Sequence, residues 1–216
     1  AADLLWDYRG WTDVMRNDFR SWVRTLGESA LDTPADGAGS EQNKYNWKLA
    51  MVGVSAGFLE HKRLLNAAVQ EHIDRLPTWI GAPGSKFDGV MLLERGRIEP
   101  KGGLFYSNYA IKAMLHLAAV AWVNGIDLYR AENRKAPGAT LEHALDTYVG
   151  FNTNPKTWTF TPTNGIGAGL YGAWEWAHLH LGKPAYLSVV QKQPGGRLAP
   201  MYYGVHTSLT VSGVGD

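Results

Sequence analysis

Residues 102–125 read GGLFYSNYAIKAMLHLAAVAWVNG, and this stretch decides the fold class of the chain. From Leu104 to Val123 it is long, largely apolar and free of glycine and proline, which predicts a helix buried on most of its faces. Asn124 and Gly125 follow and supply the signal that commonly ends a helix.

Helical signals also dominate the rest of the chain. From residue 2 to residue 26 apolar side chains recur at steps of three and four, as one helix face requires, and Gly27 is expected to end that helix. Further helices are expected over residues 43–60, 62–76 (stopped before Pro77), 140–151 (with Thr140 as N-cap), 167–181 and 184–191. In the tail, residues 201–211 alternate and are rich in Tyr, Thr and Val, which predicts one short β-strand.

This order of elements predicts an all-α fold over residues 1–216, which we interpret as a single domain. The helix lengths vary and no heptad pattern is sustained, so helical hairpins in a ring or open arc fit better than a coiled coil or a short repeat. Long loops at residues 27–42, 81–103 and 152–166 are expected to line one end of that arc.

The composition narrows the function classes. With 21 basic and 20 acidic residues the net charge is +1, so no basic footprint for nucleic acid or an anionic membrane exists. No stretch is apolar enough to span a membrane, and without cysteine neither a disulfide nor a thiolate zinc site can form. No signal-peptide pattern opens the chain, but a processed chain would look the same, and we expect a secreted or periplasmic protein.

The content of 9 tryptophans and 10 tyrosines is high for this length. Their rings combine large apolar faces with a polar group, on which sugar rings can stack. A carbohydrate cleft would explain this content, and a core with wide helix spacing is the alternative.

Tyr106 stands at the head of the long apolar helix, just after a loop rich in charged residues and glycine. A phenol has an ordinary pKa of about 10, which nearby positive charge lowers, so it can then transfer protons at moderate pH. Tyr109 follows three residues later and can share the same face. The alternative is that one of the two tyrosines faces the core and the other the solvent.

Two polar segments could supply partners to Tyr106. Asn43 and Asn46 share a helix face with Trp47, and such an amide pair can bind a carboxylate or a hydroxyl; simple N-capping by Asn43 is the alternative. Arginines at 95 and 97, with Lys101, lie in the loop before Tyr106 and can neutralise an acidic substrate, unless they form a solvated charge run.

A further group lies near the C-terminus, where Arg197 precedes Tyr202 and His206. A lone histidine such as His206 is more often structural. The other histidines lack ligand spacing: His178 and His180 fall on different helix faces, and His61 and His116 have no partners. No metal or nucleotide motif is present, so we expect neither a metal nor another cofactor.

Taken in order, these segments resemble the alginate lyase-like polysaccharide lyases. The run Gln42-Asn43-Lys44-x-x-Trp47 is similar to the family's Asn-Asn-His-x-x-Trp signature, and residues 88–97 resemble its Asp-Gly…Glu…Arg segment. The run from Leu104 to Ala110 resembles its catalytic-tyrosine helix. Residues 117–129 and 197–209 resemble its helix end and its closing segment, so the similarity covers most of the chain.

The resemblance implies an (α/α) toroid of which this chain is the C-terminal part, lacking N-terminal helices. Another chain or fragment would then complete the ring. The implied chemistry is β-elimination on an anionic uronate polymer such as alginate or glucuronan. Asn43 and either Arg95 or Arg97 would neutralise the uronate carboxylate, Tyr106 would act as base, acid or both, and no metal would be needed.

Two departures from the family pattern affect this interpretation. Lys44 stands where the family has a histidine, so Lys44 itself, His206 or a residue of another chain would have to replace the imidazole. The arginine spacing also differs, which leaves Arg95 and Arg97 as equal candidates.

Two other functions compete with a lyase. A glycoside hydrolase on a similar toroid would need two carboxylates flanking the bond, for which Glu94, Glu99 and Glu175 are candidates without diagnostic spacing. A carbohydrate-binding module without catalysis is the non-enzymatic alternative, favoured by Lys44.

Overall fold

The computed structural model describes residues 6, 8–32, 42–98, 101–162 and 172–192. These residues form α-helices, one 3-10 turn and loops, and two isolated β-bridges are the only strand pairing among them. The helices are α1 (Asp13–Asp32), α2 (Gln42–Leu59), α3 (Lys62–Trp79), α4 (Gly103–Val123), α5 (Leu141–Thr153), α6 (Trp174–Leu181) and α7 (Pro184–Lys192), with the 3-10 turn η2 at Pro155–Thr157. The all-α prediction is therefore confirmed, and the strand predicted at 201–211 lies outside the described residues.

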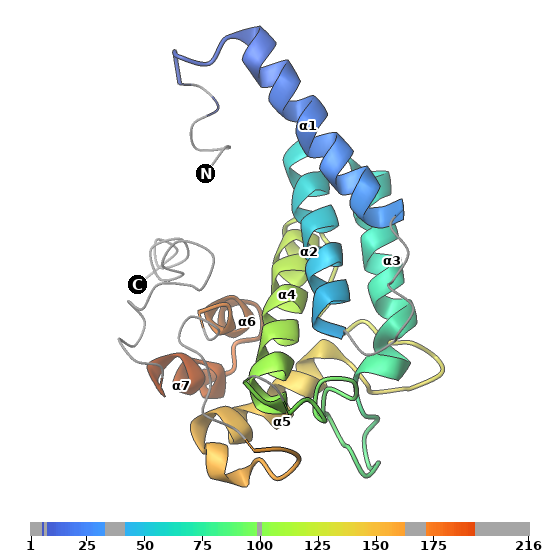
Figure 1. The fold of residues 1–216 in the computed structure, drawn as a ribbon, viewed down its shortest axis with the longest axis vertical. Helices are drawn as coiled ribbons and strands as arrows, with labels where there is room; N and C mark the ends of the chain where they lie inside the picture. The colour runs from blue at the N-terminus through green and yellow to red at the C-terminus, as the bar shows by residue number, and fades with distance from the viewer. Residues whose placement is uncertain (1–5, 7, 33–41, 99–100, 163–171, 193–216) are drawn as a thin grey trace.

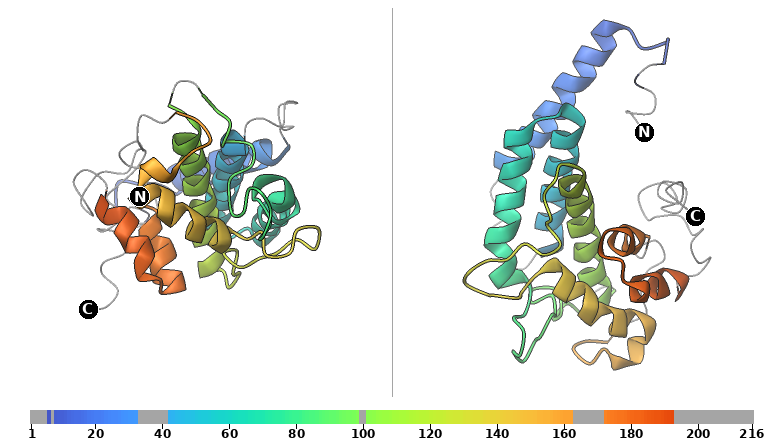
Figure 2. Two further views of the ribbon diagram at one scale, coloured as in Figure 1. Left: turned by 90° about the horizontal axis from the view of Figure 1, so that it is seen from below. Right: turned by 180° about the vertical axis from the view of Figure 1, so that it is seen from behind.

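Helix α4 is the central element of this arrangement. Figure 1 shows α2, α3 and α4 side by side, with α1 crossing the upper ends of α2 and α3. Helix α5 lies across the lower end, and α6 packs on the side of α4 away from α3. Figure 2 shows the same order from behind. In α4, 14 of 21 residues are buried, as the apolar sequence predicts.

Small residues let α2 approach α4 closely. A Cβ on Gly53 would lie 2.4 Å from Leu117 Cδ1, and one on Gly57 would lie 2.9 Å from Val120 Cγ1. These two glycines stand in the interior of α2 despite their low helix propensity. We infer that glycine is required at both positions because a larger side chain would not fit between the two helices.

Most helix boundaries follow local signals. Thr140 caps α5, because its side-chain oxygen accepts a hydrogen bond from the His143 N–H, as predicted. Helix α4 ends at Asn124 and Gly125, and Gly125 has a positive φ of 78°. Helices α2 and α7 also match the predicted ranges to within a residue or so.

Three predicted helix boundaries are wrong. Helix α1 begins at Asp13 and continues through Gly27, which is buried against Ser55 and Leu64 and allows close packing there rather than ending the helix.

Helix α3 runs past Pro77 to Trp79. A proline in the last turn costs only one hydrogen bond, and the Ile80 N–H still donates to the Leu76 carbonyl. Helix α6 begins only at Trp174; residues 167–171 of that prediction lie outside the described part.

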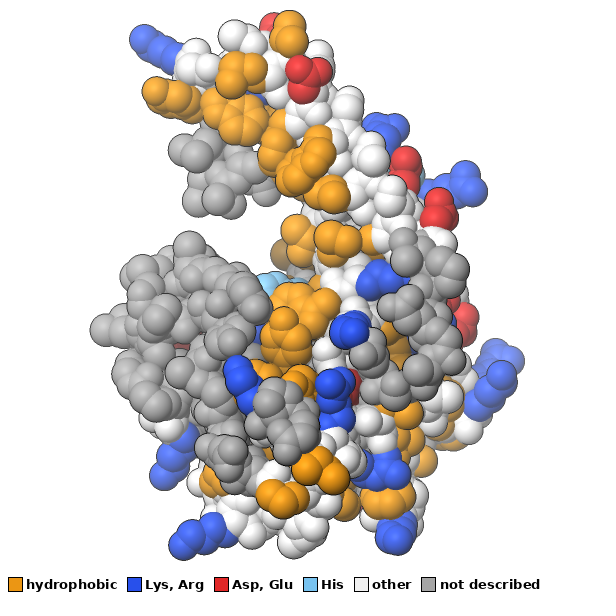
Figure 3. Space-filling view, viewed as in Figure 1, with side chains coloured by type: hydrophobic (Ala, Val, Ile, Leu, Met, Phe, Trp, Pro, Cys, Tyr) orange, Lys and Arg blue, Asp and Glu red, His pale blue; other side chains and the backbone are white. Residues whose placement is uncertain are grey.

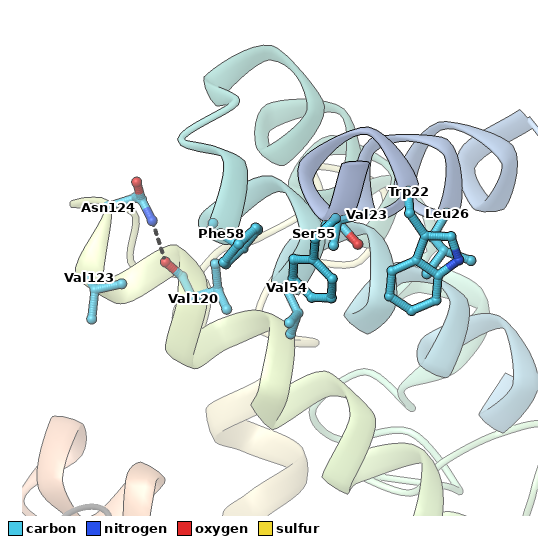
Figure 4. Close-up of a pocket in the computed structure, with 11 residues that line it drawn as sticks. Trp22, Val23, Leu26, Val54, Ser55, Phe58, Val120, Val123 and Asn124 are labelled. Carbon is cyan, nitrogen blue, oxygen red and sulfur yellow. Dashed lines mark hydrogen bonds between the residues drawn. The ribbon is translucent and has the colours of Figure 1, made fainter. Parts of the chain in front are cut away.

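A largely apolar pocket of about 480 Å³ lies between α1, α2 and α4 (Figure 4). Its lining includes Phe19 and Trp22 of α1, Phe58 of α2 and Val120 of α4. It sits at the C-terminal end of α4, about 20 Å along the helix from Tyr106. It therefore belongs to a different region from the residues considered next. No helix in the described residues is long and apolar enough to cross a membrane.

Candidate active site

The loop between α3 and α4 is fixed to its surroundings by local turns. The Asp88 carboxylate accepts a hydrogen bond from the Gly84 N–H at 2.8 Å and lies 2.6 Å from His143 Nε2 on α5. The Gly84 N–H, and to a lesser degree His143, lowers the pKa of Asp88. Gly89 has a positive φ of 66° and lies too close to Thr147 for any side chain. This turn anchors the loop on α5.

Glu94 is the buried centre of the site. Its side chain is 0% exposed, and its Oε1 accepts hydrogen bonds from Asn43, from the backbone N–H at 2.6 Å and from Nδ2 at 2.8 Å. Its Oε2 lies 3.6 Å from Arg97 Nη1. A carboxylate at the start of α2 is also favoured by the helix dipole. Glu94 therefore links the first turn of α2 to the arginine of the loop.

Arg97, and not Arg95, is the arginine that reaches Tyr106. The Arg97 Cζ lies 3.9 Å from the centroid of the Tyr106 ring, a distance typical of cation–π contact. Arg95 instead places its Cζ 4.0 Å from the ring of Phe87. Tyr106 itself is half-buried, so its ring is held while part of it stays accessible.

The entry of the chain into α4 leaves no room for a side chain. A Cβ on Gly103 would lie 2.4 Å from the Arg95 carbonyl oxygen, and the Gly103 N–H donates to Thr161 Oγ1 at 3.0 Å. Gly102 before it has a positive φ of 81°. The two glycines of the sequence motif thus allow the arginine loop to pass directly over the start of the tyrosine helix.

Aromatic rings continue from Tyr106 along α4. Phe105 lies 5.4 Å from Tyr106 and is stacked on Tyr109 at 6.1 Å, measured between ring centroids. The Tyr109 ring in turn lies 5.1 Å from Trp47 of α2, and Lys101 Nζ lies 4.4 Å from the Phe105 ring. Four predicted residues, Trp47, Lys101, Tyr106 and Tyr109, therefore lie in one region. On the face in Figure 3, hydrophobic side chains gather over α2 and α4, with Lys and Arg beside them.

The other predicted residues have different surroundings. Asn43 lies inside α2 and donates to Glu94, so the N-capping alternative is wrong. Asn46 is 1% exposed, and its Nδ2 donates to the Gln42 carbonyl within the helix. Lys44 is exposed in the first turn of α2. Arg197, Tyr202 and His206 lie outside the described residues.

Two of the three carboxylates considered for a hydrolase lie in the described residues, and both are buried. Glu94 and Glu175 are buried, at 0% and 2% exposed, and Glu94 is bonded to Asn43. Glu99 lies outside the described residues. No group of acidic residues and histidines in the described ranges is arranged to hold a metal ion.

Two polar residues of α4 are absent from the predicted site: Lys112, which no motif indicates, and His116, which lacks a partner at ligand spacing. Lys112 is 0% exposed, and burial lowers its pKa to about 8. His116 lies one turn further on, where burial, with the nearby Lys112 charge, lowers its pKa to about 4. The sequence does carry a signal for these two residues, because polar side chains are unusual in so apolar a helix and a lysine is rarely fully buried unless it is paired.

The model of the family described as Alginate lyase matches residues 1–158, which is more than half of the chain. The chain belongs to the alginate lyase family. The family match contains Asn43, Glu94, Arg97 and Tyr106, so the described site falls within it.

Among solved structures, the chain is similar to an alginate lyase from Bacteroides ovatus, with 19% identity and a TM-score of 0.69. The match covers 89% of this chain and 51% of that lyase, so the chain spans about half the length of its structural relative. At this identity the likeness establishes the fold alone, an (α/α) toroid. No curated protein sequence matches the chain significantly.

Proposed function

We propose that the protein is a polysaccharide lyase that cleaves a uronic-acid polymer by β-elimination. The observation that carries this proposal is the contact of Arg97 with Tyr106, 3.9 Å from guanidinium carbon to ring centroid, in a chain of the alginate lyase family. A cation and a phenol held together at a helix start suit a reaction in which negative charge develops beside a proton transfer.

In this reaction Arg97 binds the carboxylate of the uronate ring, which makes the neighbouring C5 proton more acidic. Tyr106, as the phenolate, takes that proton, the electron pair of the C5–H bond forms the C4=C5 double bond, and the C4–O bond breaks. The leaving glycosidic oxygen receives the proton back from Tyr106. Arg97 is the better placed of the two arginines because its side chain is 27% exposed and contacts the Tyr106 ring.

Asn43 has a supporting role in this proposal. One N–H of its side-chain amide donates to Glu94, and in this proposal the second N–H would donate to the substrate carboxylate. Trp47, Tyr109 and Lys101 would bind neighbouring sugars by stacking and by charge. A polymeric substrate also agrees with a secreted or periplasmic location, and the second half of the toroid would come from further polypeptide.

The test is to mix the protein with alginate, polymannuronate and glucuronan and to follow the ultraviolet absorbance of the unsaturated product. We expect absorbance to rise with at least one polymer and to be lost in Tyr106→Phe. Tyr8→Phe, which changes an exposed tyrosine 63% accessible to solvent, is the matched control and should retain activity. Reducing ends that appear without the absorbance would instead indicate a hydrolase. Binding of the polymer without any product would indicate a carbohydrate-binding module.

A further inference from the structure

The aromatic contacts do not end at Tyr109. Trp47 lies 5.1 Å from Tyr109 and 5.6 Å from His116, so its indole bridges two residues about 10 Å apart along α4. His116 then meets Trp176 of α6 edge-on, with ring centroids 4.8 Å apart. A continuous row of rings therefore runs from Tyr106 across α2 and α4 to α6.

Each ring in the second half of this row remains partly accessible. Trp47, His116 and Trp176 are all half-buried, neither sealed in the core nor freely exposed. A half-buried indole is fixed by packing and still offers part of its surface to a sugar ring. Three such rings from three different helices form a surface that is rigid before any ligand binds, which lowers the entropic cost of binding.

The charge around the row suits a uronate. His116 stays neutral above its lowered pKa of about 4, so its imidazole has one N–H donor and one acceptor nitrogen for sugar hydroxyl groups. Lys112 lies one turn before His116 on α4 and brings positive charge to the same side. At the other end of the row, Lys101 and Arg97 contact the rings of Phe105 and Tyr106.

We propose that His116, held between Trp47 and Trp176, forms a saccharide subsite remote from Tyr106, so that the polymer lies along α4 from the Arg97 end toward α6. This inference rests on the proposed function, because it takes a uronate polymer as the ligand. The subsite contributes to long substrates and not to short ones, since a disaccharide bound at Arg97 and Tyr106 does not reach His116.

The experiment measures binding rather than turnover. Saturated uronate disaccharides and hexasaccharides are titrated by calorimetry into protein carrying Tyr106→Phe, so that no substrate is consumed. In that background Trp176→Leu and His116→Gln keep most of the side-chain volume. We expect each to weaken hexasaccharide binding about tenfold, because a ring contact of about 1.4 kcal/mol is lost, and to leave disaccharide binding unchanged. Trp22→Leu, at an exposed indole of α1, is the matched control.

The outcomes separate this proposal from the lyase activity. If wild-type protein cleaves a polymer but Trp176→Leu and His116→Gln bind hexasaccharide as the parent does, the subsite is overturned and the lyase stands. If no polymer is cleaved but hexasaccharide binding depends on both residues, the subsite stands and the lyase is overturned. Equal losses for the two ligand lengths, or no binding at all, overturn the subsite. Circular dichroism of each variant excludes unfolding as the cause of a loss.

Discussion

Glu94 accepts two hydrogen bonds from Asn43 with one oxygen, at 2.6 Å from the backbone N–H and 2.8 Å from Nδ2. The two residues are 51 positions apart, and their contact joins α2 to the loop that carries Arg97. Because Glu94 is fully buried, its charge must be compensated in place. The carboxylate therefore holds both Asn43 and Arg97, of which Arg97 contacts the Tyr106 ring.

Replacing Glu94 by Gln should disturb both partners. The amide keeps one acceptor oxygen for Asn43 but turns a neutral group toward Arg97, so the arginine loses its ion pair. We expect stability to fall by about 2 kcal/mol and kcat to fall more than KM rises. Urea denaturation and product absorbance measure the two effects. Glu132→Gln, at an exposed carboxylate, is the control; equal behaviour of the two variants would contradict a positioning role for Glu94.

The two arginines of the loop should differ when each is changed to Lys. Arg97→Lys loses the planar guanidinium over Tyr106, and we expect kcat/KM to fall by about tenfold or more. Arg95→Lys affects a contact with Phe87 instead and should cost less than about threefold. Steady-state kinetics on the same polymer measure both variants. A larger loss in Arg95→Lys would reverse our assignment.

Gly103→Ala tests the close approach of the loop to α4. The added methyl group would lie 2.4 Å from the Arg95 carbonyl oxygen, which belongs to backbone and can move only with the loop. We expect a loss of about 1–3 kcal/mol in unfolding free energy and a loss of activity. Gly96→Ala is a matched control in the same loop, because nothing lies within 4 Å of the added atom. Thermal denaturation of Gly103→Ala and Gly96→Ala measures the difference in stability between the two variants. Equal stability would contradict the close packing of the loop against α4.

His72 should make the protein sensitive to acid. It is fully buried in α3, and burial lowers its pKa from 6.5 to about 4. Between these values the unfolded chain binds a proton that the folded protein does not, so stability falls as pH falls through this window. The loss approaches about 3 kcal/mol at the lower end.

Urea denaturation at pH values inside and above that window measures this effect. His72→Phe, which has a ring of similar size and no titrating group, should reduce the slope of this part of the pH profile by about half, because His116, whose pKa is also lowered to about 4, keeps its own contribution. His61→Phe is the control, because His61 is the half-buried N-cap of α3 and removing its ring should leave the slope in place. An unchanged slope in His72→Phe would show that another group causes the acid sensitivity.

The sequence predicts a helix end correctly where that end depends on interactions between residues close together in the chain. The Thr140 cap and the Asn124-Gly125 end depend on hydrogen bonds and φ angles within a few residues, and both are confirmed. The helix ends predicted at Gly27 and before Pro77 are wrong, because a glycine can instead be required by a neighbouring helix and a proline is tolerated in a last turn. Tertiary packing outweighed local propensity at Gly27.

By itself, the sequence determined the all-α class and the place of Tyr106 at the head of α4. The order of its motifs also indicated the alginate lyase family. Each of these depends on residues near one another in the chain. Only the tertiary structure shows that Arg97, and not Arg95, contacts the Tyr106 ring. It also shows that Glu94 is buried and bonded to Asn43, and that His116 lies between the indoles of Trp47 and Trp176. Those relationships join segments tens of residues apart. They depend on how the helices pack, which no local pattern of side chains specifies.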